Sequence, residues 1–90
     1  MKVIKIGAEW CPGCIVMRPR WKEIEGELPW LETSYLDYDD DHDEAVKFVK
    51  EDGNLPTFVF VSKDGQEILR LQGEISKPEI IKAIEENKNK

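Results

Sequence analysis

Both cysteines of this 90-residue chain lie in one tetrapeptide, Cys11-Pro12-Gly13-Cys14. The tetrapeptide follows the short β-rich run 3–6 and precedes a segment, ending near Gly26, that has helical spacing of apolar residues. Proline is tolerated in the first turn of a helix, where its missing N–H costs nothing. The sequence therefore predicts a strand, a reactive loop and a helix in succession, and it places both thiols where the helix begins.

The spacing of the two cysteines limits what they can do. Two thiols separated by two residues can close a small ring, so the pair can alternate between dithiol and disulfide. A thiol at a helix start faces unpaired backbone N–H groups and the positive end of the helix dipole, which favour the reactive thiolate. Redox, structural and metal-binding roles are all open on this evidence alone, and the surrounding residues have to distinguish them.

Length and charge narrow the choice. Residues 1–90 are long enough for one domain, and the net charge of -6 disfavours nucleic acid or an anionic membrane as a partner. No stretch approaches the ~18 apolar residues of a membrane span, and residues 1–7 lack the features of a signal peptide. We therefore expect a cytoplasmic protein, in which a close cysteine pair points to catalysis or metal binding.

The first predicted helix carries Ile15, Met17, Trp21 and Ile24 on its apolar side, and Pro19 is expected to kink it. A second strand is predicted at 33–37. The acidic residues that follow are Asp37, Asp39, Asp40, Asp41, Asp43 and Glu44. They lack the ligand order of an EF-hand calcium loop, so we expect an exposed turn that leads into a helix over 43–50.

The remaining segments predict a hairpin. The continuous apolar run 57–61 is typical of a strand in the middle of a sheet. A tight turn over 63–66 leads into a strand over 67–72, with Leu69 and Leu71 on one face and Ile68 on the other.

A final helix is predicted after Ser76 and Glu79, which form a capping-box pattern, and the polar tail 85–90 is expected to fray. The order of elements is βαβαββα. It predicts an α/β fold in which three helices flank a four-stranded mixed sheet.

With this order around Trp10 and the cysteine tetrapeptide, the chain resembles the thioredoxin family from about Val3 to the end of the last helix. Pro19 falls where the family has its kinking proline, Leu55-Pro56-Thr57 is similar to the family's cis-proline segment, and Gly73 follows the last strand like the substrate-loop glycine. The family's N-terminal strand and helix have no counterpart before Val3. The resemblance is therefore to the minimal, glutaredoxin-like version of the thioredoxin fold.

The resemblance implies a protein-disulfide reductase that works as a monomer. Cys11, at the exposed helix end, is implied as the attacking thiolate and Cys14 as the resolving thiol. The redox-active Cys11–Cys14 disulfide then takes the place of a bound cofactor. Disulfide-containing proteins are the implied substrates, and thioredoxin reductase or glutathione is the implied electron donor.

The same resemblance implies a substrate-binding surface around the cysteines. It is made of Trp10, Pro12, Gly13, Leu55, Pro56 and Gly73. A cis Pro56 leaves the backbone of Leu55 free to pair with an extended substrate segment.

Lys5 is the main departure from the family pattern, because it stands where typical thioredoxins place a buried acid that handles the proton of the second cysteine. Two roles are open. The stem of Lys5 covers the sheet while its ammonium reaches water, or the ammonium approaches Cys14 and favours the thiolate there. In the second case, the proton would pass through water, Glu9 or the lysine itself.

Three other functions compete. A glutathione-dependent, glutaredoxin-type enzyme fits the chain length and the proline-first motif, although the acidic charge and the residues after Gly73 favour it less. A metal-binding module would need a second chain, because one C-x-x-C supplies two of four ligands and His42 lies in the acidic turn. A redox-inactive interaction module would keep the fold without using the thiols.

Overall fold

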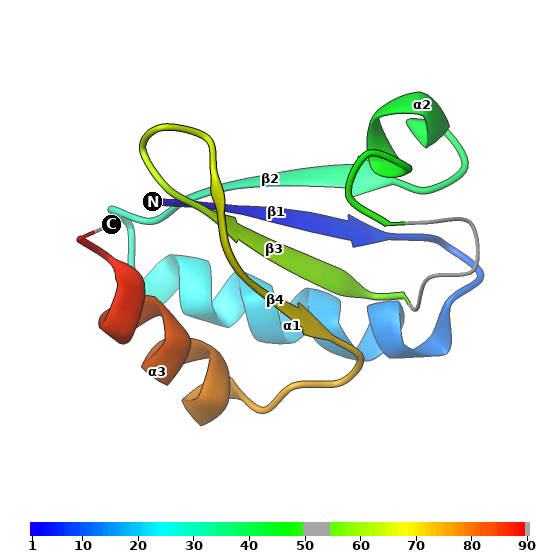
Figure 1. Cartoon of the computed structure of the whole chain (residues 1–90). Coiled ribbons are helices and arrows are strands. Elements are labelled where there is room, and N and C mark those ends of the chain that lie inside the picture. Colours follow the sequence, from blue (N-terminus) through cyan, green and yellow to red (C-terminus); the bar gives the residue numbers. More distant parts are fainter. Residues whose placement is uncertain (50–54, 90) are drawn as a thin grey trace.

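A four-stranded mixed sheet, with strand order β2-β1-β3-β4, organises the structure (Figure 1). The computed structural model describes residues 1–49 and 55–89. Its elements are β1 (Lys2–Gly7), α1 (Pro12–Glu27), β2 (Glu32–Asp37), α2 (His42–Ala45), β3 (Thr57–Val61), β4 (Glu67–Gln72) and α3 (Lys77–Asn87). The predicted βαβαββα order and the α/β fold are confirmed. No helix among the described residues has the length and apolar character needed to cross a bilayer.

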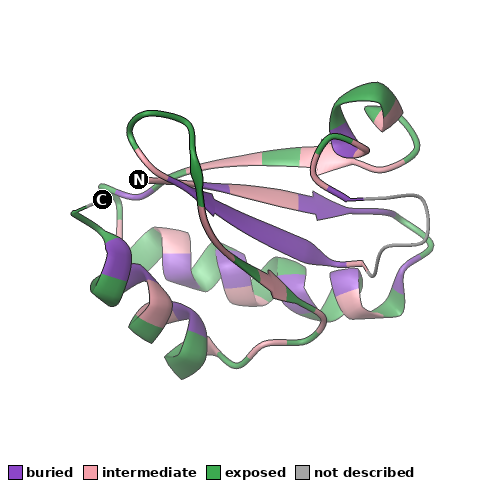
Figure 2. Ribbon diagram, viewed as in Figure 1, coloured by how far each residue is buried: buried purple, intermediate pink, exposed green. Residues whose placement is uncertain are grey.

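The register of the sheet brings the carboxyl end of β1 next to the start of β3. β1 runs parallel to β2, with Lys5 opposite Tyr35, and antiparallel to β3. All five residues of β3 are buried, as its continuous apolar sequence predicts (Figure 2). The carboxyl end of β1 therefore leads directly to the cysteine loop, beside the start of β3.

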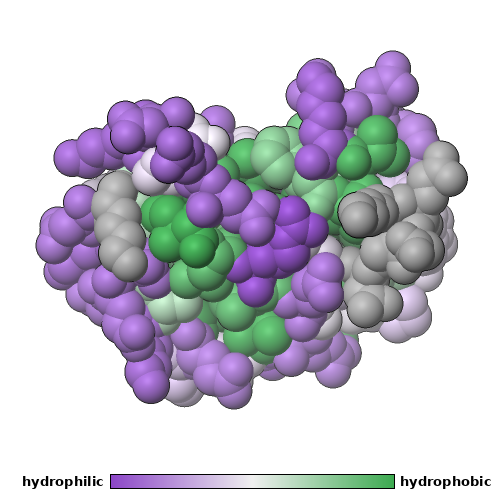
Figure 3. All heavy atoms as spheres, viewed as in Figure 1, coloured by the Kyte–Doolittle hydropathy of each residue, from purple (hydrophilic) through white to green (hydrophobic). Residues whose placement is uncertain are grey.

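The helices lie on both faces of the sheet. α1 and α3 cover one face (Figure 1), where Met17, Trp21 and Ile84 belong to the larger core cluster. The rings of Trp21 and Phe58 pack at a centroid distance of 5.2 Å. The smaller cluster on the opposite face includes Ala45 of α2. The side of the molecule seen in Figure 3 has apolar side chains near its middle, with hydrophilic side chains around them.

The prediction for Ile15 was wrong: this side chain is 56% exposed. The buried positions of α1 are Cys14, Met17, Trp21 and Ile24. These residues follow the three- and four-residue spacing of one helical stripe, and Ile15 lies one residue away from it. Pro19 is inside α1, which continues on both sides of it.

The helix predicted over 43–50 was also wrong in extent. The helix ends at Ala45, and the next turns tighten, because the N–H groups of Lys47 and Phe48 donate to carbonyl oxygens three residues earlier, at 3.2 and 3.0 Å. Residue 50 lies outside the described residues.

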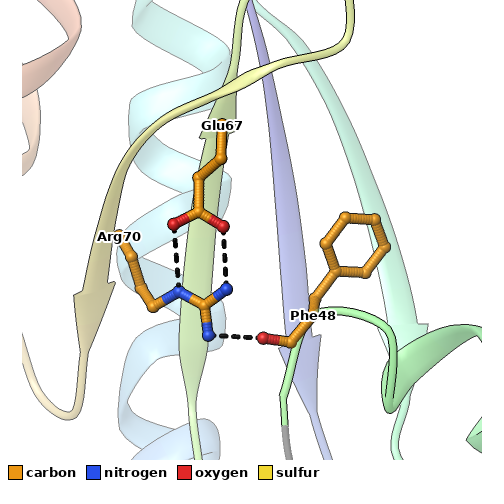
Figure 4. Close-up of polar contacts among 3 residues, drawn as sticks. All are labelled: Phe48, Glu67 and Arg70. Atoms are coloured by element: carbon orange, nitrogen blue, oxygen red, sulfur yellow. Dashed lines mark hydrogen bonds and ion pairs between the residues drawn. The ribbon is translucent and has the colours of Figure 1, made fainter.

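The carbonyl of Phe48 accepts a hydrogen bond from the Arg70 guanidinium of β4 (Figure 4). Glu67 holds the same guanidinium from the other side, at 2.8 Å from Nη2. The hydrogen bond from Arg70 satisfies the Phe48 carbonyl, which in a longer helix would accept a backbone N–H from the next turn.

Two smaller differences concern the C-terminal half. The pairing of β3 with β4 shifts at Phe60 and Val61, which leaves Ile68 as an extra residue on β4. Ile68 therefore joins Leu69 and Leu71 against the larger core, and its predicted opposite orientation was wrong. α3 extends to Asn87, whose side chain donates to the carbonyl of Ala83 at 2.7 Å, so the expected fraying from residue 85 was wrong as well.

Candidate active site

Cys11 is the N-cap residue of α1, and its sulfur is held by the helix itself. The Cys11 backbone is extended, Pro12 begins the helix, and the Cys14 N–H donates to Cys11 Sγ at 3.2 Å. Helix N-termini leave N–H groups unpaired and favour negative charge. The predicted strand–loop–helix geometry therefore places Cys11 Sγ at the N-terminus of α1, beside its backbone N–H groups.

Both thiols are free and covered. Cys11 and Cys14 are each 4% exposed, so the expectation that Cys11 lies at an exposed helix end was wrong. The reason is that the N-cap geometry turns the sulfur inward, into a small cluster with Ala8 and Cys14 against which Leu55 packs. The neighbouring Trp10 and Pro12 are exposed and flank the pair.

Cys14 differs from Cys11 in its electrostatics. Burial, reinforced by the hydrogen bond with Cys11, raises the pKa of Cys14 to about 12, while the positive charge of Arg18 acts in the opposite direction. Cys14 is therefore a neutral thiol at neutral pH. A group that deprotonates or stabilises it is required before it can act as a nucleophile.

The predicted cis-proline segment lies directly against the cysteine loop. The Leu55–Pro56 peptide bond is cis, as the family resemblance implied. A Cβ on Gly13 would stand 3.1 Å from Pro56 Cδ, so a glycine is needed for the two loops to approach this closely. The carbonyl of Pro56 accepts a hydrogen bond of 2.8 Å from the N–H of Gly73, whose φ of +85° suits glycine. Four of the predicted substrate-binding residues are thus brought together.

Trp10 is the most exposed large apolar residue, at 63%, and it is anchored rather than loose. Its indole Nε1–H donates to Asp39 Oδ2 at 2.7 Å. Asp39 belongs to the acidic turn, which we had expected only to be solvated. The spacing of the acidic run gave no means of selecting Asp39, because the contact joins residues 29 positions apart.

Lys5 occupies an environment that neither predicted role described. Its side chain is 17% exposed, its ammonium lies 2.7 Å from Glu25 Oε2 of α1, and it stands 5.8 Å from the centre of the Trp21 ring. The other Glu25 oxygen accepts a hydrogen bond from Thr33. Lys5 is therefore ion-paired within the protein. Its role in tuning Cys14 stays a prediction, as does that of Glu9, which is exposed beside Trp10.

Tyr35 and Arg18 are neighbours of Cys14 that the sequence analysis missed. A Cβ on Gly7 would lie 3.1 Å from Cys14 Sγ and 3.3 Å from Tyr35 Oη, so both atoms occupy the space beside this glycine. Burial raises the pKa of Tyr35, and the neighbouring Arg18 opposes that rise. To find these neighbours one would need to know the register of β1 and β2, and the sequence alone does not give the pairing of strands.

The sequence matches the thioredoxin family model over residues 1–86. The chain belongs to the thioredoxin family. The thioredoxin of Mycoplasmopsis pulmonis (strain UAB CTIP) is 30% identical over 70 residues, which are 72% of this chain and 63% of that protein. The chain therefore spans less than two thirds of the length of this curated thioredoxin.

Solved thioredoxins share the fold. Fasciola hepatica thioredoxin is 30% identical, with a TM-score of 0.81 over 93% of this chain and 77% of its own. Mitochondrial thioredoxin 3 from Saccharomyces cerevisiae, in its oxidized form, is 31% identical, with a TM-score of 0.77 over 93% of this chain and 76% of its own. The described residues contain no cluster of three or more His, Cys, Asp or Glu side chains arranged to hold a metal ion.

Proposed function

We propose that this protein is a thiol–disulfide oxidoreductase that reduces disulfides in partner proteins. One observation carries the proposal: the sulfur of Cys11 caps the N-terminus of α1, accepts the Cys14 N–H at 3.2 Å and lies in the loop that packs against cis Pro56. Membership of the thioredoxin family supports the same chemistry.

In the first step, the Cys11 thiolate attacks one sulfur of a partner disulfide. A bond forms between Cys11 and that sulfur, and the other partner sulfur leaves with the electron pair and takes up a proton. In the second step, Cys14 loses its proton and attacks Cys11 Sγ. The mixed disulfide breaks, the second partner sulfur leaves as a thiolate that is then protonated, and the Cys11–Cys14 bond closes.

The proposed docking surface surrounds the cysteine loop. Trp10, fixed by Asp39, offers a rigid apolar platform with one polar edge. Leu55 and cis Pro56 would present backbone groups to an extended segment of the substrate, in the manner of an added strand. Gly73, bonded to the Pro56 carbonyl, closes the other side.

We further propose that the protein acts as a cytoplasmic monomer and receives electrons from thioredoxin reductase. Glutathione is the alternative donor. Turnover with NADPH and thioredoxin reductase, compared with turnover with glutathione and its reductase, distinguishes the two donors.

The cysteine assignment is tested with Cys14→Ser and Cys11→Ser variants and a disulfide-bonded protein such as insulin. Cys14→Ser should accumulate a mixed disulfide with the substrate, visible by mass spectrometry under non-reducing conditions. Cys11→Ser should lose exchange above background. Equal activity of the two variants would contradict the assignment.

A further inference from the structure

A cavity of about 80 Å³ is lined by Cys14 and by residues of β1, α1, β2 and β3. It has room for water, because one buried water needs only ~10–15 Å³ of this kind of volume. Its polar lining comes from three elements: Lys5 of β1, Cys14 and Arg18 of α1, and Tyr35 of β2. Apolar residues complete the wall, namely Ile6, Met17, Pro56 and Phe58.

Within this cavity, Tyr35 and Cys14 converge on Gly7. Their Oη and Sγ atoms both lie in van der Waals reach of the position that a Gly7 side chain would occupy, at 3.3 and 3.1 Å. Arg18 lines the same cavity and lowers the pKa of Tyr35. The Tyr35 hydroxyl can donate its proton to a neighbouring acceptor, because a hydroxyl is both a donor and an acceptor.

The other polar groups of the cavity are less suited to help Cys14. The ammonium of Lys5 is committed to Glu25 at 2.7 Å. Trp21 also lines the cavity, and its buried Nε1–H has no hydrogen-bond partner among the residues that the structure describes. Buried donors of this kind are usually satisfied by ordered water. A water in the cavity would therefore have polar partners on several sides.

We propose that Tyr35, beside Arg18 in this cavity, stabilises the Cys14 thiolate in the resolving step by donating a hydrogen bond through water. Tyr35 is thus a positioning residue, and the inference rests on the proposed function. In the step itself, the Cys14 proton passes to the cavity water, the Cys14 thiolate forms a bond with Cys11 Sγ, and the bond between Cys11 and the partner breaks. The electron pair leaves with the partner sulfur, which takes up one proton, so two electrons and two protons pass from the dithiol to the substrate overall.

The charged and titratable groups near Cys14 come from several elements around it. α1 contributes Cys11 and Arg18, and β1 contributes Lys5, which lines the cavity and pairs with Glu25. β2 contributes Tyr35, with Asp37 acting on Tyr35. The contacts from the Pro56 loop and β3 are the uncharged Pro56 and Phe58. Arg18 is therefore the cation that opposes the effect of burial on Cys14.

The experiment uses the full chain and dithiobis(nitrobenzoate) in stopped flow. Attack by Cys11 releases one coloured thiolate, and attack by Cys14 on the resulting mixed disulfide releases a second one. Tyr35→Phe should slow the second phase about tenfold or more, the effect of losing one hydrogen bond to a charged group. It should also move the pH midpoint of that phase upward while leaving the first phase unchanged.

Tyr38→Phe, which removes a hydroxyl from the residue just after β2, is the matched control and should leave both phases unchanged. Arg18→Met should slow the second phase, and Arg18→Lys should restore part of the rate. A second phase in Tyr35→Phe with the wild-type rate and pH midpoint would overturn the inference while leaving the proposed function intact. Failure of the wild-type protein to release any thiolate would overturn both.

Discussion

The two cysteines belong to one turn of helix, yet their surroundings differ in kind. Cys11 faces backbone groups: a helix N-terminus and the loop of cis Pro56. Cys14 faces side chains across a cavity, with Arg18 and Tyr35 as its polar neighbours. The difference teaches that the first step of exchange depends on main-chain geometry that a short motif specifies. The second step depends on residues that the fold brings from other strands.

Substitution of two glycines should have the largest effect and tests the contrast between the surroundings of Cys11 and Cys14. A Gly7→Ala side chain would press on Cys14 Sγ and Tyr35 Oη, and a Gly13→Ala side chain would press on Pro56. Overpacking of this kind costs about 1–3 kcal/mol. We expect Gly7→Ala to slow mainly the resolving phase and Gly13→Ala mainly the first attack, both measured with the two-phase thiol assay. If both variants slowed the same phase, the division between the two surroundings would be wrong.

The raised pKa of Cys14 predicts that the stability of the protein falls in the alkaline range. This pKa is raised from 9.0 to about 12 in the folded protein. Between these values the unfolded chain releases the Cys14 proton and the folded chain keeps it, so the free energy of unfolding of the dithiol form falls as pH rises. Denaturant unfolding of the reduced protein from pH 8 to 11 measures the fall. A Cys14→Ala variant should show a smaller decline, and an identical decline would argue against the burial effect.

The smallest expected effect concerns the Cys11 side. Asp39→Asn should weaken the bond to the Trp10 indole, which is exposed to solvent and is worth about 1 kcal/mol. We expect a few-fold higher KM for a protein disulfide with kcat little changed. Asp40→Asn, in the same exposed turn, is the matched control. An unchanged KM in Asp39→Asn would show that the orientation of Trp10 does not contribute to docking.

The residues that the sequence could predict are those whose role is local. Cys11, Pro12 and Cys14 reveal a helix start by their order, and Leu55-Pro56 carries a recognisable segment whose cis bond the structure confirms. The position of Ile68 could not be predicted, because a one-residue irregularity in the β3–β4 pairing reverses the alternation of side chains.

The functional neighbours of Cys14 escaped prediction for a related reason. Tyr35 reaches the cavity through its parallel register with Lys5, and that register is a property of the assembled sheet. The pairing of Lys5 with Glu25 joins a strand to the last turn of a helix and depends on how α1 packs. Local patterns contain neither relation, so the motif alone does not reveal that Lys5 pairs with Glu25.

Gly7 has a consequence for protein engineering. The space beside it is shared by the resolving sulfur and a phenol from the next strand, so a scaffold that received only the tetrapeptide would carry a side chain where these two atoms meet. The smallest transferable unit is therefore the eight-residue stretch from Gly7 to Cys14, together with a parallel neighbouring strand that supplies Tyr35. A graft of this unit transfers the space beside Gly7 as well as the two thiols.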